Sequence, residues 1–431
     1  MESPYTPLLY SPSRREPTST RVSTTFLSGI LLFVVLNCLL TAEAILSTYQ
    51  TQFASDPPFS ALTTDHDNLL KCANWRPNPN NTHPPLASWE SVEFDLPIDA
   101  KSLFVVSRGS LSSGIVRVHE SSHVKDLKIS VSAHYHKKEA LSRARVCLVD
   151  RENDGKGVVI LTPVRWFPPK RKDRLHFVVD VTFPSPSQGI RHVSSFTLAL
   201  PRFVLDVDHL SGYSFRSLIL KSTNRPVSVN SVTGETIIAE GKNGKIEGSF
   251  NVTRLLKITT TNSPINVSLN AHSNLPRKPT VVFLKSTNSP LHSNVSLSTN
   301  SSSDTGGNFR VHTHTSNAAL SVSFSSGPPE SRLVFDGSTR NAPARVALDP
   351  AFEGGFLLQT TQFRPTVHLT PGVEDPTGRG RQRKMNDRVV GGRAVIGNVS
   401  WVPPGKYPQA RPEGPSWASV SSRNAPVTLV L

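Results

Sequence analysis

The sequence Leu220-Lys221-Ser222-Thr223-Asn224-Arg225-Pro226-Val227 recurs almost unchanged as Leu284-Lys285-Ser286-Thr287-Asn288-Ser289-Pro290-Leu291. Further copies read Ile258-Thr259-Thr260-Thr261-Asn262-Ser263-Pro264-Ile265, Lys242-Asn243-Gly244-Lys245-Ile246, Thr315-Ser316-Asn317-Ala318-Ala319-Leu320, Arg340-Asn341-Ala342-Pro343 and Arg423-Asn424-Ala425-Pro426-Val427. From Asn224 the first five asparagines of these copies are spaced by 19, 19, 26 and 29 residues. A period of this length is typical of stacked β-coils.

Each residue of the repeated sequence suits a sharp corner. Asparagine tolerates the left-handed backbone conformation that we expect there, and the proline two residues later fixes an extended exit. The aliphatic residue that follows then enters the core. Because one repeat cannot bury its own apolar edge, several must stack on one another.

The composition favours many short strands joined by turns. The 431 residues include 35 Pro, 25 Gly and only 2 Met, which argues against all-α and doubly wound α/β classes. Between residues 86 and 202, apolar and polar residues alternate, as in Val92/Phe94/Leu96 and Leu127/Ile129/Val131. We therefore predict an all-β protein: a strand-rich membrane-proximal region that continues into solenoid-like stacked β-coils, preceded by one transmembrane helix.

The N-terminal region contains an uncharged segment, residues 22–42. At about 1.5 Å per residue it is long enough to span the roughly 30 Å hydrocarbon core, so we expect a signal-anchor. Arg14, Arg15 and Arg21 precede it and predict a cytoplasmic N-terminus with an extracytoplasmic C-terminus, the type II topology. The alternative is a cleaved signal peptide, because Ala42-Glu43-Ala44 resembles a cleavage site.

Sequons and cysteines point to the same compartment. Six Asn-x-Ser/Thr sequons follow the span and predict glycosylation: Asn80, Asn251, Asn266, Asn294, Asn300 and Asn398. Cys38 lies within the span, which leaves Cys72 and Cys147 as the candidate disulfide of the ectodomain. Two separate thiols remain the alternative for this pair.

The expected organisation follows from these features. It comprises a disordered cytoplasmic tail (1–21), a transmembrane signal-anchor (22–42), a stalk (43–85), a β-rich domain (86–202), a β-coil repeat region (203–350) and a closing β region (351–431) with a basic loop (372–388).

A search for catalytic chemistry identifies no catalytic, cofactor-binding or metal-binding residue. The most suggestive carboxylates are Asp206 and Asp208, which we interpret as a solvated strand face. His134-Tyr135-His136 and His312-Thr313-His314 each place two imidazoles on one face of a strand, which we interpret as exposed histidines rather than metal ligands. Gly391-Gly392-Arg393-Ala394-Val395-Ile396-Gly397 lacks the Lys-Ser/Thr of a phosphate-binding loop.

The chain is basic, with 47 Lys and Arg against 32 Asp and Glu, a net charge of +15. The basic stretches Lys170–Arg174 and Arg379–Arg388 would face anionic polysaccharide or lipid headgroups in the expected topology, and no nucleic acid. Solvated loops without a partner are the simpler interpretation.

The Thr-Asn-x-Pro-aliphatic copies and Asn243-Gly244-Lys245-Ile246-Glu247-Gly248 resemble the coils of the putative adhesin family of unknown function, which has β-solenoid-like domains and related uncharacterised fungal single-pass membrane proteins. The resemblance covers about residues 203–350. It implies a fold and no active residues, because the motifs encode corners.

We expect a membrane-anchored, non-enzymatic protein of the cell surface or secretory pathway. Its role would be structural or binding, with an anionic glycan or cell-wall polysaccharide as its partner and no cofactor. The alternatives are a carbohydrate-active enzyme of the same compartment and a luminal trafficking factor.

Overall fold

The computed structural model describes residues 67–73, 76–77, 88–162, 174–274, 278–300, 304–405 and 416–431. The chain divides into two units, residues 1–64 and 65–431, and everything described lies in the second. The expected tail 1–21, the expected span 22–42 and the sequon Asn80 therefore lie outside the described residues. In the part of the chain that is described, we find no helix with the length and apolarity that a membrane crossing needs.

The all-β prediction is confirmed. The strands belong to one hydrogen-bonded sheet, and α2 (Lys138–Leu141) is the only helix among the described residues. The N-terminal strands are β1 (Asp67–Cys72), β2 (Arg76–Pro77), β3 (Ser88–Leu96), β4 (Ser102–Arg108), β5 (Ser112–Ser121), β6 (Leu127–Tyr135), β7 (Arg145–Arg151), β8 (Gly155–Leu161), β9 (Leu175–Pro184) and β10 (Arg191–Ala199). Two rows of neighbours result, β2–β3–β6–β9–β5 and β1–β7–β8–β4–β10.

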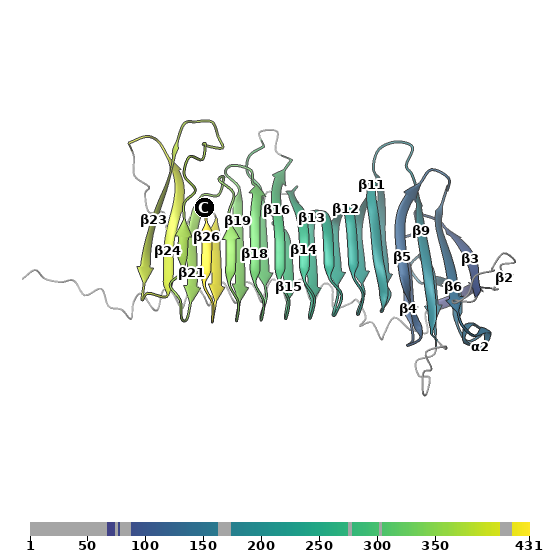
Figure 1. The fold of residues 1–431 in the computed structure, drawn as a ribbon. Coiled ribbons are helices and arrows are strands. Elements are labelled where there is room, and N and C mark those ends of the chain that lie inside the picture. Colours follow the sequence, from purple (N-terminus) through teal and green to yellow (C-terminus); the bar gives the residue numbers. More distant parts are fainter. Residues whose placement is uncertain are drawn as a thin grey trace, which may run out of the picture. The chain divides into compact units, whose positions relative to one another are not determined.

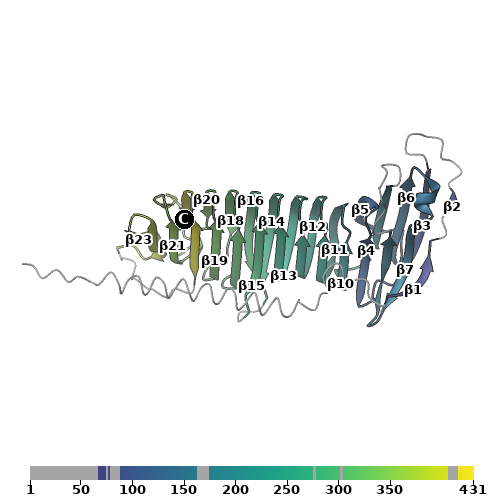
Figure 2. The same ribbon diagram turned by 90° about the horizontal axis from the view of Figure 1, so that it is seen from below.

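Both rows continue into the repeat region as parallel ladders (Figures 1 and 2). Three long strands contribute to both ladders: β11 (Phe203–Lys221), β12 (Val227–Glu240) and β13 (Ile246–Thr260). Ladder 1 adds their C-terminal halves to β10 and continues with β15 (Thr280–Ser286), β17 (Asn308–His314), β19 (Arg332–Thr339), β25 (Trp417–Ser422) and β21 (Gly354–Thr360). Ladder 2 adds their N-terminal halves to β5 and continues with β14 (Ile265–Ser273), β16 (Leu291–Thr299), β18 (Leu320–Ser326), β20 (Ala344–Ala347), β26 (Val427–Val430) and β22 (Thr366–His368).

The register places equivalent residues of successive repeats next to one another. The aliphatic residues that follow each corner form one buried column of ladder 2: Val227, Ile246, Ile265, Leu291, Leu320, Ala344 and Val427. These residues share one core with the N-terminal strands, where the ring centroids of Phe183 and Phe196 are 5.2 Å apart. The prediction that the residue after the corner enters the core is therefore confirmed.

The expected backbone conformation of the corners is wrong. Among the described residues, the non-glycine positions with positive φ are Asn153, Asp154, Arg202, Asp304 and Glu330. None of the corner asparagines is among them. Asparagine is therefore required at the corners for another reason, which lies in its side chain.

Spatial order differs from chain order at the C-terminus. β25 lies between β19 and β21, and β26 lies between β20 and β22, in both cases with parallel pairing on each side. The last two strands therefore fill a gap between two repeats that precede them in the chain. This insertion is visible in Figure 1, where the C-terminus lies among the strands of the two ladders.

Two segments differ from the expected organisation. β1, in the expected stalk 43–85, pairs with β7, so this part of the segment belongs to the sheet. The expected basic loop 372–388 ends in a strand, because β23 (Gln382–Val390) pairs antiparallel with β24 (Ala394–Val402) along its length. Gly391 and Gly392 both have positive φ, which the tight turn between these strands requires.

Candidate binding surface

The corner asparagines form a continuous hydrogen-bonded ladder. Its members are Asn224, Asn243, Asn262, Asn288, Asn317, Asn341 and Asn424. The Nδ2 of each asparagine donates to the Oδ1 of the preceding one, and all six distances are 2.7 Å. A side-chain amide can donate to one neighbour and accept from the other, which explains the repeated choice of asparagine.

Ladder 2 presents columns of small polar side chains on its outer face. One column contains Thr233, Asn251, Asn270, Ser296 and Ser326. Neighbouring members of this column are hydrogen-bonded to one another: Asn251 Nδ2 donates to Thr233 Oγ1 at 3.3 Å, and the hydroxyls of Ser296 and Ser326 are 2.7 Å apart. Neighbouring strands are about 4.8 Å apart, so the polar groups repeat at that interval.

A groove of about 180 Å³ lies on this face of ladder 2. Its polar lining includes Ser249, Asn251, Ser268, Asn270, Asn294 and Ser296, with no charged residue. Amides and hydroxyls both donate and accept hydrogen bonds, so they can match the hydroxyl groups of a neutral sugar. We name these six residues the amide groove.

The structure places the described sequons on three surfaces. Asn251 and Asn294 line the amide groove, and Asn266 is exposed on β14 between them. Asn300 is exposed but donates through Nδ2 to Asn274 Oδ1 at 3.0 Å. Asn398 lies on β24, half-buried opposite Asn386.

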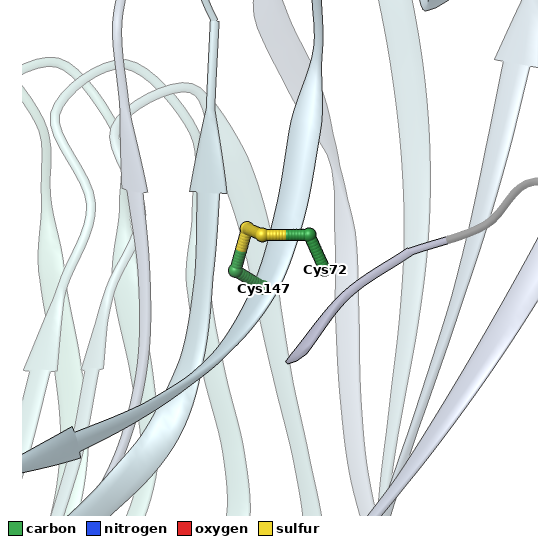
Figure 3. The surroundings of a disulfide bond; sticks show 2 residues. All are labelled: Cys72 and Cys147. Atoms are coloured by element: carbon green, nitrogen blue, oxygen red, sulfur yellow. A yellow bond between two sulfur atoms is a disulfide. The ribbon is translucent and has the colours of Figure 1, made fainter. Parts of the chain in front are cut away.

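Cys72 and Cys147 are bonded through their sulfur atoms, with an S–S distance of 2.08 Å (Figure 3). They are direct partners in the register of β1 and β7. Because this pair closes a 75-residue separation, it ties the first described strand to the row that starts ladder 1.

The candidate carboxylates Asp206 and Asp208 lie on β11, outside the amide groove. Asp208 accepts a hydrogen bond from Asn230 Nδ2 at 2.8 Å, and this bond, with that from the backbone N–H of His209, lowers the pKa of Asp208. Asp206 is exposed and lies in register with Ser228 and Arg117.

His312 and His314 lie on the same face of β17, as expected, but both are half-buried rather than exposed. His134 is half-buried too and lies opposite His176 in the pairing of β6 with β9, with ring centroids 6.2 Å apart, whereas His136 is exposed. His312 Nδ1 is 3.8 Å from a carboxylate oxygen of Asp336. In the described part of the chain no three His, Cys, Asp or Glu side chains form a group suited to a metal.

Two arginines of the basic stretch 379–388 make internal contacts, Arg381 and Arg383. Arg381 donates to Asp375 at 3.0 Å and to Glu353 at 3.1 Å, and its guanidinium holds the pKa of Asp375 well below the usual range. Arg383 lies over the ring of Trp401, 5.9 Å from its centroid. These two arginines hold β23 to the closing strands, whereas Arg379 and Arg388 of the same stretch are exposed. Lys170–Asp173 of the other basic stretch lie outside the described residues.

Comparisons with known proteins add little. No family model matches the chain, and no curated protein matches it. A solved structure, described as a putative cell adhesion protein from Clostridium sporogenes, aligns at 9% identity over 79% of this chain and 99% of its own, with a TM-score of 0.17. At that TM-score the likeness carries no argument about fold or function. None of these matches is a fungal membrane protein, so the resemblance stated from the sequence stays an expectation.

Proposed function

We propose that this chain is a single-pass type II membrane protein whose β-rich part lies outside the cytoplasm, at the cell surface or in the secretory pathway. The uncharged segment 22–42 and the sequons Asn80, Asn266, Asn300 and Asn398 support this topology, whereas a glycan on Asn251 or Asn294 would fill the amide groove. The disulfide between Cys72 and Cys147 adds support, because disulfides persist in oxidising compartments.

In this proposal ladders 1 and 2 are the two walls of a β-solenoid, and the outer face of ladder 2 is its binding wall. The protein is a structural or binding component, not an enzyme, and its partner is a glycan of the cell wall or surface. The observation that carries this function is the amide groove, where amides and hydroxyls repeat at the spacing of the strands. Regular polar groups on a rigid sheet can bind a repeating polymer without catalysing a reaction on it.

The proposal is tested with neutral and acidic cell-wall oligosaccharides on an array, followed by titration of the best binder. Asn270→Ala and Ser296→Ala should each weaken binding at least fivefold, because they remove groups from the amide groove. Ser321→Ala is the matched control, since Ser321 faces outward on ladder 2 outside the groove. Equal affinity in all three variants would remove the groove from the proposal, and an array without binders would contradict the function.

The topology has its own test. Endoglycosidase should increase gel mobility of the mature protein, and protease should reach the C-terminus only from the extracytoplasmic side. Unchanged mobility together with a protected C-terminus in intact cells would contradict the localisation.

The same protein variants and oligosaccharides distinguish the two alternative functions. A carbohydrate-active enzyme would hydrolyse the bound oligosaccharide, and Asp206→Asn with Asp208→Asn would abolish that turnover. A luminal trafficking factor would be found inside the secretory pathway and would bind no wall polymer.

A further inference from the structure

A second cavity, of about 490 Å³, lies beside the corner end of ladder 1. Its lining comes from β17, β19, β25, β21 and the turn between β23 and β24. Three arginines contribute to it: Arg340, Arg393 and Arg423. We name these three residues the arginine cluster.

Backbone hydrogen bonds hold the arginine cluster together. The carbonyl of Arg340 accepts from the N–H of Asn424 at 2.8 Å, and the carbonyl of Arg423 accepts from the N–H of Thr361 at 3.2 Å. The carbonyl of Arg393 accepts from the N–H of Thr360 at 2.9 Å. Three turns that are distant in sequence are therefore fixed around one cavity.

The arginine cluster has no ion pair with a carboxylate of the described residues. All three residues are exposed, and among the described residues no carboxylate oxygen lies within 4.0 Å of their side-chain nitrogens. Arg381 in the same closing region shows the opposite arrangement, with two carboxylates at 3.0 and 3.1 Å. The basic residues of this region therefore divide into a paired set and an unpaired set.

Without a bound anion, the placement of Arg340 and Arg423 costs electrostatic free energy. They occupy the same corner position of adjacent repeats, where most other repeats carry a neutral hydroxyl: Thr223, Thr261, Thr287 and Ser316. Like charges at adjacent positions of a sheet repel each other. A bound anion between them would turn this repulsion into attraction.

The other polar groups of the cavity are mostly engaged. Thr339, Thr360 and Ser422 are buried and their hydroxyls donate to backbone carbonyls of the corners. His314 lies between the hydroxyls of Ser338 and Ser316, and burial, followed by the charge of Lys285, lowers the pKa of His314. The charged groups left to bind a ligand are the guanidinium groups of the arginine cluster, with the polar side chains of Gln359 and Ser421 beside them.

We propose that the arginine cluster binds an oxyanion, a carboxylate or sulfate group carried by an acidic polysaccharide. Guanidinium groups bind such groups through two parallel N–H···O bonds, which a lysine cannot do. That the anion belongs to a polysaccharide rests on the proposed function, whereas the site itself rests only on the cavity and its charges. Because Arg423 belongs to the C-terminal repeat, the site exists only when that repeat is inserted.

The test uses the full ectodomain and three probes: inorganic sulfate, a sulfated oligosaccharide and an oligouronic acid, with a neutral oligosaccharide of equal length as the reference. Calorimetric titration of Arg340→Gln, Arg393→Gln and Arg423→Gln should show at least a tenfold loss of affinity for the acidic oligosaccharides in each variant. Arg345→Gln is the matched control, since Arg345 is exposed in the same repeat as Arg340 but lies on ladder 2. Its affinity should stay within twofold of the wild type.

The outcomes separate the site from the function. Arg-dependent binding of sulfate without binding of any oligosaccharide would uphold the site and contradict the polysaccharide. Acidic oligosaccharides that bind the Arg340→Gln/Arg393→Gln/Arg423→Gln variant as tightly as the wild type would overturn the site and leave the proposed function standing. An equal loss in all variants, Arg345→Gln included, would also overturn the site, because it would show attraction to net charge alone. Thermal unfolding should find Arg340→Gln and Arg423→Gln at least as stable as the wild type, since removing one of two adjacent like charges relieves repulsion.

Discussion

Asn424 donates its side-chain Nδ2 to the Oδ1 of Asn341 at 2.7 Å, although 83 positions separate the two residues in the chain. This bond extends the row of hydrogen-bonded corner asparagines from the repeat of β19 and β20 into the C-terminal repeat of β25 and β26. The next member in space is Thr361, whose hydroxyl donates to the carbonyl of Arg423. β21 and β22 therefore pair in parallel with β25 and β26, and not with the repeat that precedes them in the chain.

Because of this insertion, the C-terminal repeat should stabilise the repeats on both sides of it. Leu429 is fully buried between β20 and β22, and we expect Leu429→Ala to lower the free energy of unfolding by about 2–5 kcal/mol. Thr428→Ser, at the adjacent outward position, keeps the hydroxyl that hydrogen-bonds Thr366 and should change it by less than about 0.5 kcal/mol. Denaturant unfolding measures both variants.

Hydrogen exchange gives the location of the effect. Because repeats contact only their neighbours, Leu429→Ala should reduce amide protection in β19 to β22 before it does so in β11 to β13. Uniform loss of protection across both ladders would contradict this view of the insertion.

The asparagine ladder predicts a graded response. Asn288 donates to Asn262 and accepts from Asn317, so Asn288→Ala removes two side-chain hydrogen bonds and should cost about 1–2 kcal/mol of stability. Asn224 ends the ladder and only accepts from Asn243, so Asn224→Ala should cost about half as much. Equal losses in the two variants, measured by thermal unfolding, would show that the amides contribute singly and not as a ladder.

Asn288→Asp sharpens this test. A carboxylate still accepts from Asn317 but has no proton to donate, and its second oxygen would face the Oδ1 of Asn262, so at neutral pH this variant should be no more stable than Asn288→Ala in thermal unfolding.

The disulfide predicts a redox-dependent stability. On the chain-entropy model, a link across 75 residues stabilises the fold by about 4 kcal/mol, so Cys72→Ser with Cys147→Ser should lower the free energy of unfolding by roughly this amount. Reduction should have the same effect on the wild type and none on the double variant. A reductant effect of equal size on both proteins would contradict the role of this bond.

The corner asparagines were predictable from the sequence because their spacing and the proline after them repeat. The reason why asparagine occurs there was not predictable. Asparagine would be chosen both for its tolerance of positive φ and for a side chain that donates and accepts a hydrogen bond, so the sequence alone does not distinguish the two reasons. The register explains the difference: only when Asn224 and Asn243 are known to be neighbours does the side-chain bond between them become visible.

The arginine cluster shows a different limit of prediction. The run of basic residues in the sequence includes Arg381 and Arg383, which make internal contacts in the structure. Arg340, Arg393 and Arg423 stand alone in the sequence and meet only because the C-terminal repeat inserts out of order. The sequence alone singles out only Arg340 and Arg423, which both directly precede a corner asparagine where four other repeats carry Thr or Ser and one carries Lys242.

Three histidines predict how stability depends on pH. Burial lowers the pKa of His134, His176 and His314 below the ordinary value of 6.5, and the charge of His134 lowers that of His176 further. At mildly acidic pH the unfolded chain therefore binds more protons than the folded one, so these groups reduce the free energy of unfolding as the pH falls below about 6.5 and have no effect above it. The melting temperature should accordingly be lower at pH 5 than at pH 7.5, and His134→Gln with His176→Gln should shrink this difference. Equal drops in the wild type and the double variant would mean that the titration of this histidine pair does not contribute to the acid sensitivity.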